Sequence, residues 1–188
     1  FDTAVLEGLT YGDDLIGIPF QVVTHYLFWD KDLFSAAGLD PESPPTNWDE
    51  IKEYAGKLTD ASKNQFGWLI PTDNNVVALY TMYAFGGDFT DEAGTTATLN
   101  SPENVEAFEW MYDVYVNMKA SPLDSDANTY ISGPLGMFIN GPWIINGLRE
   151  NEINFGVTAV PMNEGIDPKS SMIPVGFSIP ITTSDEHK

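Results

Sequence analysis

The sequence of 188 residues has no cysteine, which excludes disulfides, thiol catalysis and cysteine-based metal sites. Basic residues are scarce as well, because 8 Lys and Arg stand against 28 Asp and Glu and leave a formal net charge of −20. Such a surface repels phosphate backbones and anionic membranes, so we expect no nucleic-acid partner. The apolar runs fall far short of the roughly 18 residues that a membrane-spanning helix needs. The hydrophobic content of 43% is sufficient for a packed core.

The motifs of several enzyme classes are also missing. The sequence has no Gly-x-Ser-x-Gly elbow, no phosphate-binding loop and no Gly-x-Gly-x-x-Gly fingerprint. Its two histidines are His25, in a mainly apolar segment, and His187, near the C-terminus. Acidic pairs that would suit a glycosidase, such as Asp13 or Asp14 with Asp73, are too frequent in so acidic a chain to indicate an active site. We therefore expect no catalytic residue and no cofactor.

One acidic segment, 124–128, spaces oxygen ligands at alternate positions, as the start of a calcium-binding loop does. The rest of that loop is not there, because Thr129 stands where it needs glycine and Leu135 where it needs glutamate. A solvated loop or a helix cap is the better interpretation, and we expect no metal site.

Strand-like and helix-like segments alternate along the chain without an internal repeat, which is typical of an α/β layer fold. We expect strands at 15–20, 22–29, 66–70, 135–139, 155–160 and 175–181, with a break near Pro19 because proline cannot donate to a central ladder. We expect helices at 31–37, 48–58, 76–85 and from 102 onward.

Capping residues mark three helix starts. Asp30 is expected to cap the first helix, and the second has capping-box spacing at Thr46/Asp49 or at Asn47/Glu50. The third start is the clearest, with Ser101 as N-cap and Pro102 at the first helical position. The apolar residues of this last helix predict a buried side made of Val105, Phe108, Met111, Val114, Tyr115 and Met118.

The most distinctive segment ends on Trp143. The run 135–139 reads as a buried strand, Asn140-Gly141 as a turn, and Pro142 as the first residue of a helix, where its missing N–H costs nothing. Unpaired N–H groups, a positive helix end and the Trp143 indole would then point the same way, which suits a polar ligand with apolar faces such as a sugar. A core tryptophan in a tight corner is the alternative, and the residues alone favour it.

A polar turn at Asp73-Asn74-Asn75 lies where a strand is expected to meet a helix. Ligands of open α/β sheets bind beyond the carboxyl ends of strands, and the amides of Asn74 and Asn75 can both donate and accept hydrogen bonds, as sugar hydroxyls require. The alternative is that one of these residues only caps the helix that starts at Val76.

Six motifs, in order and at matching spacing, resemble the extracellular solute-binding proteins of ABC sugar importers, the group of the maltose- and maltodextrin-binding proteins. They are 15–19 with 26–34, 45–50, Gly86-Gly87, 137–143, 154–161 and Val175-Gly176. The resemblance covers most of the chain. It implies an α/β fold of the type II periplasmic-binding-protein kind, a mixed sheet flanked by helices.

The same resemblance implies a binding site. The Trp of the Asn-Gly-Pro-Trp motif stacks on a sugar ring in that family, which gives Trp143 this role. Asn74 and Val76 stand where the maltose-binding relatives supply an acidic and an aromatic contact, so sugar binding is implied but maltose specificity is not. Further candidate binding residues lie in or beside the two strands that cross between lobes: Gln21, Thr24, His25, Gly176 and Phe177.

Members of this family have two lobes, each discontinuous in sequence. The resemblance assigns 1–21 to a strip of the N-terminal lobe with the first crossing strand, 22–174 to most of the C-terminal lobe, and 175–188 to the second crossing strand. We expect the chain to be a fragment of a longer receptor, because its ends match the middle of the family pattern, and we expect an isolated lobe to bind ligand weakly.

The expected function is that of a non-enzymatic carbohydrate receptor. It would be monomeric and extracytoplasmic, either a cell-surface lipoprotein or periplasmic, and would deliver a mono- or oligosaccharide to an ABC permease in the membrane. Two alternatives remain: a glycoside hydrolase or lyase that uses acidic residues, and an acidic protein-interaction or adhesin module.

Overall fold

The structure is a computed structural model that describes residues 2–123, 125–126, 129–131 and 133–179. It divides into two compact units, the first from Phe1–Thr24 and Ser170–Lys188 and the second from His25–Lys169. In the described part of the chain no helix has both the length and the apolar character needed to cross a bilayer.

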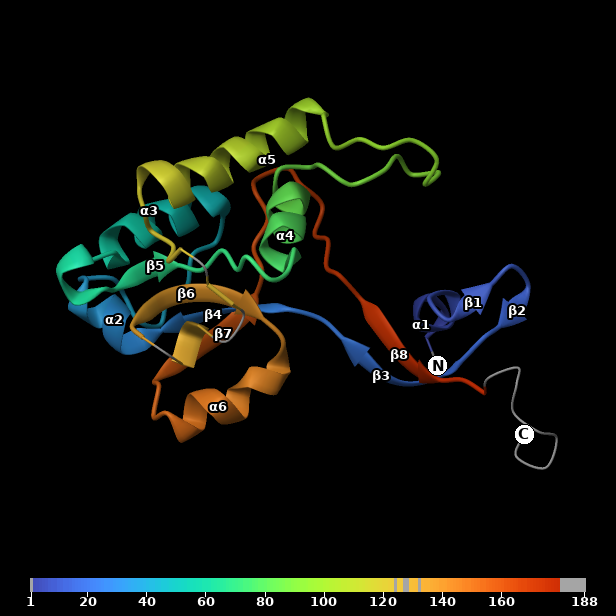
Figure 1. Ribbon diagram of the computed structural model, residues 1–188, viewed down its shortest axis with the longest axis horizontal. Helices are drawn as coiled ribbons and strands as arrows, with labels where there is room; N and C mark the ends of the chain where they lie inside the picture. Colours follow the sequence, from blue (N-terminus) through green and yellow to red (C-terminus); the bar gives the residue numbers. More distant parts are fainter. Residues whose placement is uncertain (1, 124, 127–128, 132, 180–188) are drawn as a thin grey trace. The chain divides into compact units, whose positions relative to one another are not determined.

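A four-stranded mixed sheet forms the centre of the second unit (Figure 1). Its strands lie in the order β5 (Phe66–Trp68), β6 (Leu135–Asn140), β4 (Tyr26–Asp30) and β7 (Phe155–Ala159). The β5–β6 pair is parallel and the other two pairs are antiparallel. All six residues of β6 are buried, as expected for a strand that has neighbours on both edges and layers on both faces.

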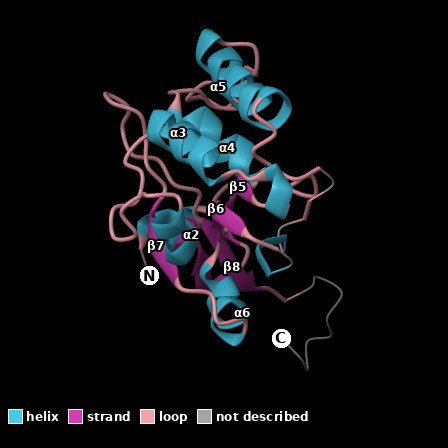
Figure 2. Cartoon of the chain, turned by 90° about the vertical axis from the view of Figure 1, so that its left-hand side faces the viewer, coloured by secondary structure: helices cyan, strands magenta, loops and turns pink. Residues whose placement is uncertain are grey.

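Helices cover both faces of this sheet. Figure 2 shows α3 (Trp48–Leu58), α4 (Val76–Ala84) and α5 (Pro102–Tyr112) on one side, and α6 (Ile145–Glu150) on the other. The alternation of side chains along β4 explains the two cores: Leu27 and Trp29 pack in the cluster that includes α3 and α4, whereas Phe28 packs in the cluster that includes α6. The short helix α2 (Lys31–Ala36) adds Phe34 to the first cluster. The predicted α/β arrangement of a mixed sheet flanked by helices is confirmed.

Short helical turns complete the second unit. They are η1 (Ala61–Lys63), η2 (Asp113–Asn117), η3 (Thr129–Ile131) and η4 (Pro142–Ile144), of which η2 is a π turn that continues α5 and the others are 3-10 turns.

The predicted N-caps are confirmed. Asp30 accepts from the N–H groups of Asp32 and Leu33, both at 2.9 Å. Of the two capping-box alternatives, the Asn47/Glu50 pair supplies the cap, because the Asn47 side chain accepts from the Glu50 N–H at 2.8 Å. Ser101 caps α5, with Pro102 at its first turn.

The first unit contains α1 (Thr3–Glu7), the two-residue strands β1 (Thr10–Tyr11) and β2 (Asp14–Leu15), and the antiparallel pair β3 (Ile18–Val23) and β8 (Ile173–Phe177). The predicted break near Pro19 takes the form of a register shift between Pro19 and Gln21, while β3 itself continues through Pro19 and ends at Val23. Among the described residues β3 pairs with β8 alone, so a residue without an N–H is tolerated there.

The predicted buried side of α5 is wrong in its first half. Val105 and Phe108 are 46% and 40% exposed, whereas Asn104, Ala107 and Trp110 are buried. Trp110 decides the orientation, because its indole packs against Trp48 at 4.9 Å and donates to the Trp48 carbonyl at 3.1 Å. The Asn104 amide nitrogen donates to the carbonyls of Asp88 and Thr98, both at 2.8 Å, which offsets part of the cost of burying the side chain.

Candidate functional site

Trp143 lies just beyond the end of the buried strand β6. The strand ends at Asn140, whose side chain accepts from the Gly141 N–H at 2.8 Å, and η4 begins at Pro142 as predicted, although as a 3-10 turn. Trp143 is 55% exposed, while the other four tryptophans are at most 5% exposed. The alternative of a core tryptophan is therefore wrong. The helix that follows, α6, has only six residues, so the exposed ring rather than a helix terminus is the distinctive feature here.

His25 lies beside Trp143. The two ring centroids are 5.6 Å apart with an interplanar angle of 85°, an edge-to-face arrangement. Strand pairing brings the two residues near each other. Tyr26 of β4 pairs with Asn140 of β6 in antiparallel register, so His25 lies opposite Gly141, two residues before Trp143. The structure thus brings together two of the residues predicted from sequence for the site.

Tyr80 of α4 is the residue that the sequence analysis missed. Its ring lies edge-to-face with His25 at 5.9 Å, and it is 1% exposed. The sequence places Tyr80 in the apolar helix predicted at 76–85. The helical pattern does not indicate which strand end this helix covers, so the contact with His25 could not be predicted.

His25 is 8% exposed, and this burial lowers its pKa below the ordinary value of 6.5. The imidazole is therefore neutral near pH 7. A neutral ring beside an indole suits an uncharged ligand, because neither group carries a charge that would select an anion or a cation.

This lowered pKa predicts how stability depends on pH. The unfolded chain binds a proton at His25 more readily than the folded chain does, so the stability from the neutral imidazole is complete above about pH 6.5 and is lost as the pH falls below it. We expect His25→Phe to reduce this loss, measured as the change in urea midpoint between pH 7.5 and 5.5. His187→Ala, which removes the other histidine, is the control, and equal pH slopes in both variants would contradict the assignment.

The two asparagines lie at the start of α4, and both are exposed. Asn74 accepts from the Val76 N–H at 3.1 Å, and its amide nitrogen donates to Asp73 at 2.9 Å. Asn75 occupies the N-cap position but makes no capping hydrogen bond with its side chain. The capping alternative therefore describes Asn74, and the side chain of Asn75 is not used in this way. Their part in ligand binding stays a prediction.

The remaining candidates belong to the first unit. Gln21 pairs with Val175 between β3 and β8, and Gly176 pairs with Pro19. Phe177 is 68% exposed and stacks on Phe20 with ring centroids 4.4 Å apart.

Thr24 lies at the end of the same unit, with its hydroxyl oxygen 2.7 Å from that of Ser170. Gly176 also has a packing role, since a β-carbon there would lie 2.8 Å from the Leu9 side chain. Whether these residues share a site with Trp143 stays a prediction.

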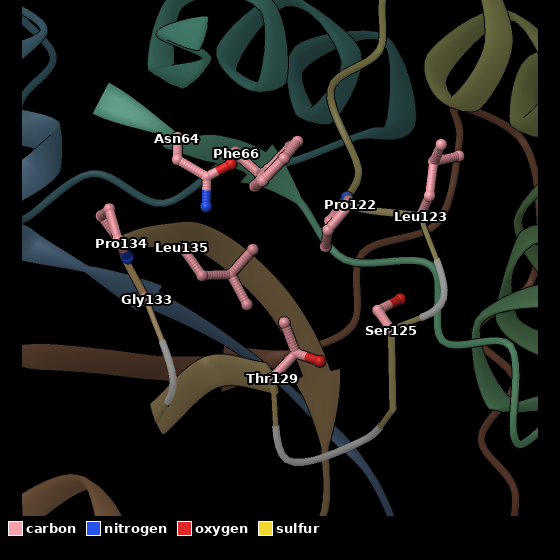
Figure 3. Close-up of a pocket in the computed structure, with 9 residues that line it drawn as sticks. All are labelled: Asn64, Phe66, Pro122, Leu123, Ser125, Thr129, Gly133, Pro134 and Leu135. Carbon is pink, nitrogen blue, oxygen red and sulfur yellow. The ribbon is translucent and has the colours of Figure 1, made fainter. Parts of the chain in front are cut away.

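A cavity of about 250 Å³ lies at the other end of β6 (Figure 3). Leu135, the first residue of the strand, lines it together with Asn64, Ser125 and Thr129. Trp143 lies three residues beyond Asn140, the last residue of β6, and none of the residues predicted for the site lines this cavity.

Metal binding has no support in the described residues, where no three His, Asp or Glu side chains are grouped so that they could hold an ion. The acidic segment 124–128 lies partly outside the described residues. Residues 180–188, which include His187, lie wholly outside them.

In comparison with known proteins, residues 1–188 match the family described as bacterial extracellular solute-binding protein. The maltotriose-binding protein of Pyrococcus abyssi is 26% identical over 157 residues, covering 82% of this chain and 33% of the relative. The sn-glycerol-3-phosphate-binding periplasmic protein UgpB of Brucella abortus is 28% identical over 174 residues, covering 88% and 40%. The chain thus spans well under half the length of these relatives.

Solved structures agree on the fold. The ribitol complex of an ABC transporter solute-binding protein from Agrobacterium radiobacter superposes with a TM-score of 0.81 at 27% identity, covering 98% of this chain and 49% of that one. Maltose-bound MalE3 of T. maritima superposes with a TM-score of 0.84 at 23% identity, covering 100% and 51%. The expected type II periplasmic-binding fold is confirmed.

Proposed function

Because this chain belongs to the family of bacterial extracellular solute-binding proteins, we propose that it is the carbohydrate-binding part of a receptor that delivers sugar to an ABC importer. The observation that carries the proposal is Trp143, an exposed indole at the end of a buried strand with a neutral imidazole beside it. The named relatives are binding proteins, and we propose that this chain likewise binds its ligand without transforming it.

A sugar has the chemistry that this surface can recognise. Its C–H face packs on an indole, and its hydroxyls pair with amide groups such as those proposed at Asn74 and Asn75. In the first unit, Gln21 and Thr24 are proposed for the same kind of hydrogen bond. Aromatic stacking together with burial of the sugar face contributes on the order of one to a few kcal/mol.

A phosphorylated ligand fits less well, although the UgpB relative is named for one. The eight proposed binding residues include no lysine or arginine, His25 is neutral near pH 7, and the chain carries a formal net charge of −20. An anion would meet no positive charge on these side chains, so a neutral sugar or polyol is the favoured ligand.

The two compact units support a proposal for the lobes. The chain passes between the units at Thr24/His25 and at Lys169/Ser170, close to the boundaries predicted from sequence. We assign the first unit to a strip of the N-terminal lobe and the second to most of the C-terminal lobe, and the coverage of the relatives supports a fragment of a longer receptor. The family description supports an extracytoplasmic location, and we propose a monomer that is periplasmic or lipid-anchored and meets a membrane permease.

The test is calorimetric titration of maltotriose, ribitol and sn-glycerol 3-phosphate into the gene product that contains these residues and into the 188-residue chain. We expect a sugar or polyol to bind the gene product, and Trp143→Ala to weaken that binding about tenfold or more without changing the melting temperature. Trp143→Phe, which keeps an aromatic face, should retain most of the affinity.

Three results would overturn the proposal: unchanged affinity in Trp143→Ala, binding of the phosphate ester alone, or release of new reducing ends from maltotriose. The last would favour the glycoside hydrolase alternative.

A further inference from the structure

We propose that Gly141 and His25 are positioning residues that hold the Trp143 indole in one orientation before ligand arrives. The effect of this positioning on sugar affinity rests on the proposed function. The positioning itself can be measured without ligand, from the fluorescence of Trp143. Neither residue has to touch the sugar for the proposal to hold, because each acts through Trp143.

Gly141 provides the space in which the indole lies. A β-carbon built on Gly141 would overlap the six-membered ring of Trp143, so the ring rests directly against the backbone at this position. The backbone angles of Gly141, φ −89° and ψ 169°, are open to any residue. Glycine is therefore needed here for close approach and not for its conformational freedom.

His25 limits the indole from a second direction. It is almost fully buried, it contacts Trp143 edge-to-face at 5.6 Å, and Tyr80 contacts it in turn at 5.9 Å. Tyr80 is fixed in the core of α4, and its own edge-to-face neighbour is Tyr83 at 6.3 Å. A row of rings thus connects the packed helix to the one exposed tryptophan.

Two supports account for an exposed ring with a fixed orientation. A large side chain that is 55% exposed ordinarily samples several rotamers, and a ligand that stacks on it must then offset the lost freedom. The backbone of Gly141 and the ring of His25 remove much of that freedom in advance. The remaining indole surface is preset for stacking, which raises affinity without any further contact with the ligand.

The exposure pattern of the tryptophans allows a direct test without ligand. An aqueous quencher such as acrylamide reaches Trp143, whereas the other four indoles are at most 5% exposed. Subtracting the fluorescence of Trp143→Phe from that of the wild-type protein leaves the signal of Trp143. The quenching and the anisotropy of this difference signal therefore report on this one side chain. We expect Gly141→Ala and His25→Ala each to lower the anisotropy of this signal and to increase its quenching.

The matched controls are His25→Phe, which keeps a ring beside the indole, and Gly147→Ala. Gly147 lies in the helix that follows Trp143, and a β-carbon there would meet nothing closer than the Tyr130 hydroxyl at 3.4 Å. Both controls should keep the wild-type signal, and all four variants should melt within a few degrees of one another.

Sugar affinity is the second readout. We expect Gly141→Ala to weaken binding about tenfold, close to the effect of Trp143→Ala, and His25→Ala to weaken it severalfold while His25→Phe restores it. Wild-type fluorescence in Gly141→Ala and His25→Ala would overturn the positioning role. If the fluorescence changes as expected but no sugar binds the wild-type protein, positioning stands and the proposed function fails.

Discussion

Replacing Gly67 by alanine is expected to destabilise the second unit by at least about 3 kcal/mol, the upper end of the cost of adding atoms to a packed core. A β-carbon on Gly67 of β5 would overlap the carbonyl group and Cα of Ala55, which is fully buried in α3. These are backbone atoms of a helix, so no side chain can rotate out of the way. The Gly67 N–H also donates to the Thr59 hydroxyl at 3.1 Å, which fixes the strand against the end of the helix.

Urea unfolding followed by circular dichroism measures this effect. Gly133→Ala is the matched control, because among the described residues no atom lies within 4 Å of a β-carbon placed there, and the residue does not adopt a positive φ. We expect the control to unfold near the wild-type midpoint. A change of less than 1 kcal/mol in Gly67→Ala would show that α3 does not lie directly on β5.

Replacing Trp48 by alanine is expected to cost about 3–5 kcal/mol of the free energy of unfolding. Its side chain is fully buried between two other indoles, with ring centroids 5.8 Å from Trp68 and 4.9 Å from Trp110. Its own indole N–H donates to the Pro161 carbonyl at 2.8 Å. The substitution therefore removes a large apolar group, breaks two aromatic contacts and leaves a carbonyl without this donor.

Trp143→Ala is the control of identical chemistry for Trp48→Ala. Because Trp143 is 55% exposed, we expect its loss to change the free energy of unfolding by less than about 1 kcal/mol. The two substitutions should thus separate: one affects stability and the other affects sugar affinity. Equal destabilisation in both variants would mean that Trp143 belongs to the core after all.

The helix starts could be predicted because capping is local. Asp30, Asn47 and Ser101 each bond to an N–H two or three residues further on, so the relevant partners lie within one short window of sequence. The orientation of α5 could not be predicted in this way. Its apolar pattern has two possible faces, and the choice depends on the fit of Trp110 against Trp48, which comes from a distant helix.

In the site, too, local features could be predicted from sequence and contacts between distant residues could not. The strand, the turn and the helical start at Pro142 follow from residues adjacent in sequence, but the exposure of Trp143 does not, because these residues alone favoured a core position. Its contact with His25 depends on the pairing of Tyr26 with Asn140, and the contact of His25 with Tyr80 depends on where α4 lies. Register and helix placement are decided by the whole core, so sequence alone could propose His25 for the site but could not place it beside the indole.

The discontinuity of the first unit has a consequence for the order in which the protein folds. Thr24 and Ser170, whose hydroxyls lie 2.7 Å apart, are 146 positions apart in the sequence. Closing a flexible loop of that length costs roughly 4 kcal/mol of chain entropy. The second unit is contiguous in sequence, and when it folds it brings these two positions together, so the β3–β8 pair forms without bearing that cost.

During synthesis the two strands of this pair emerge at very different times. The apolar residues Ile18, Phe20 and Val22 of β3 leave the ribosome well before β8, and the β3–β8 pair can form only after β8 has been made. A substitution that destabilises the second unit, such as Gly67→Ala, should therefore unfold both units. A substitution that destabilises the β3–β8 pair should leave the second unit folded.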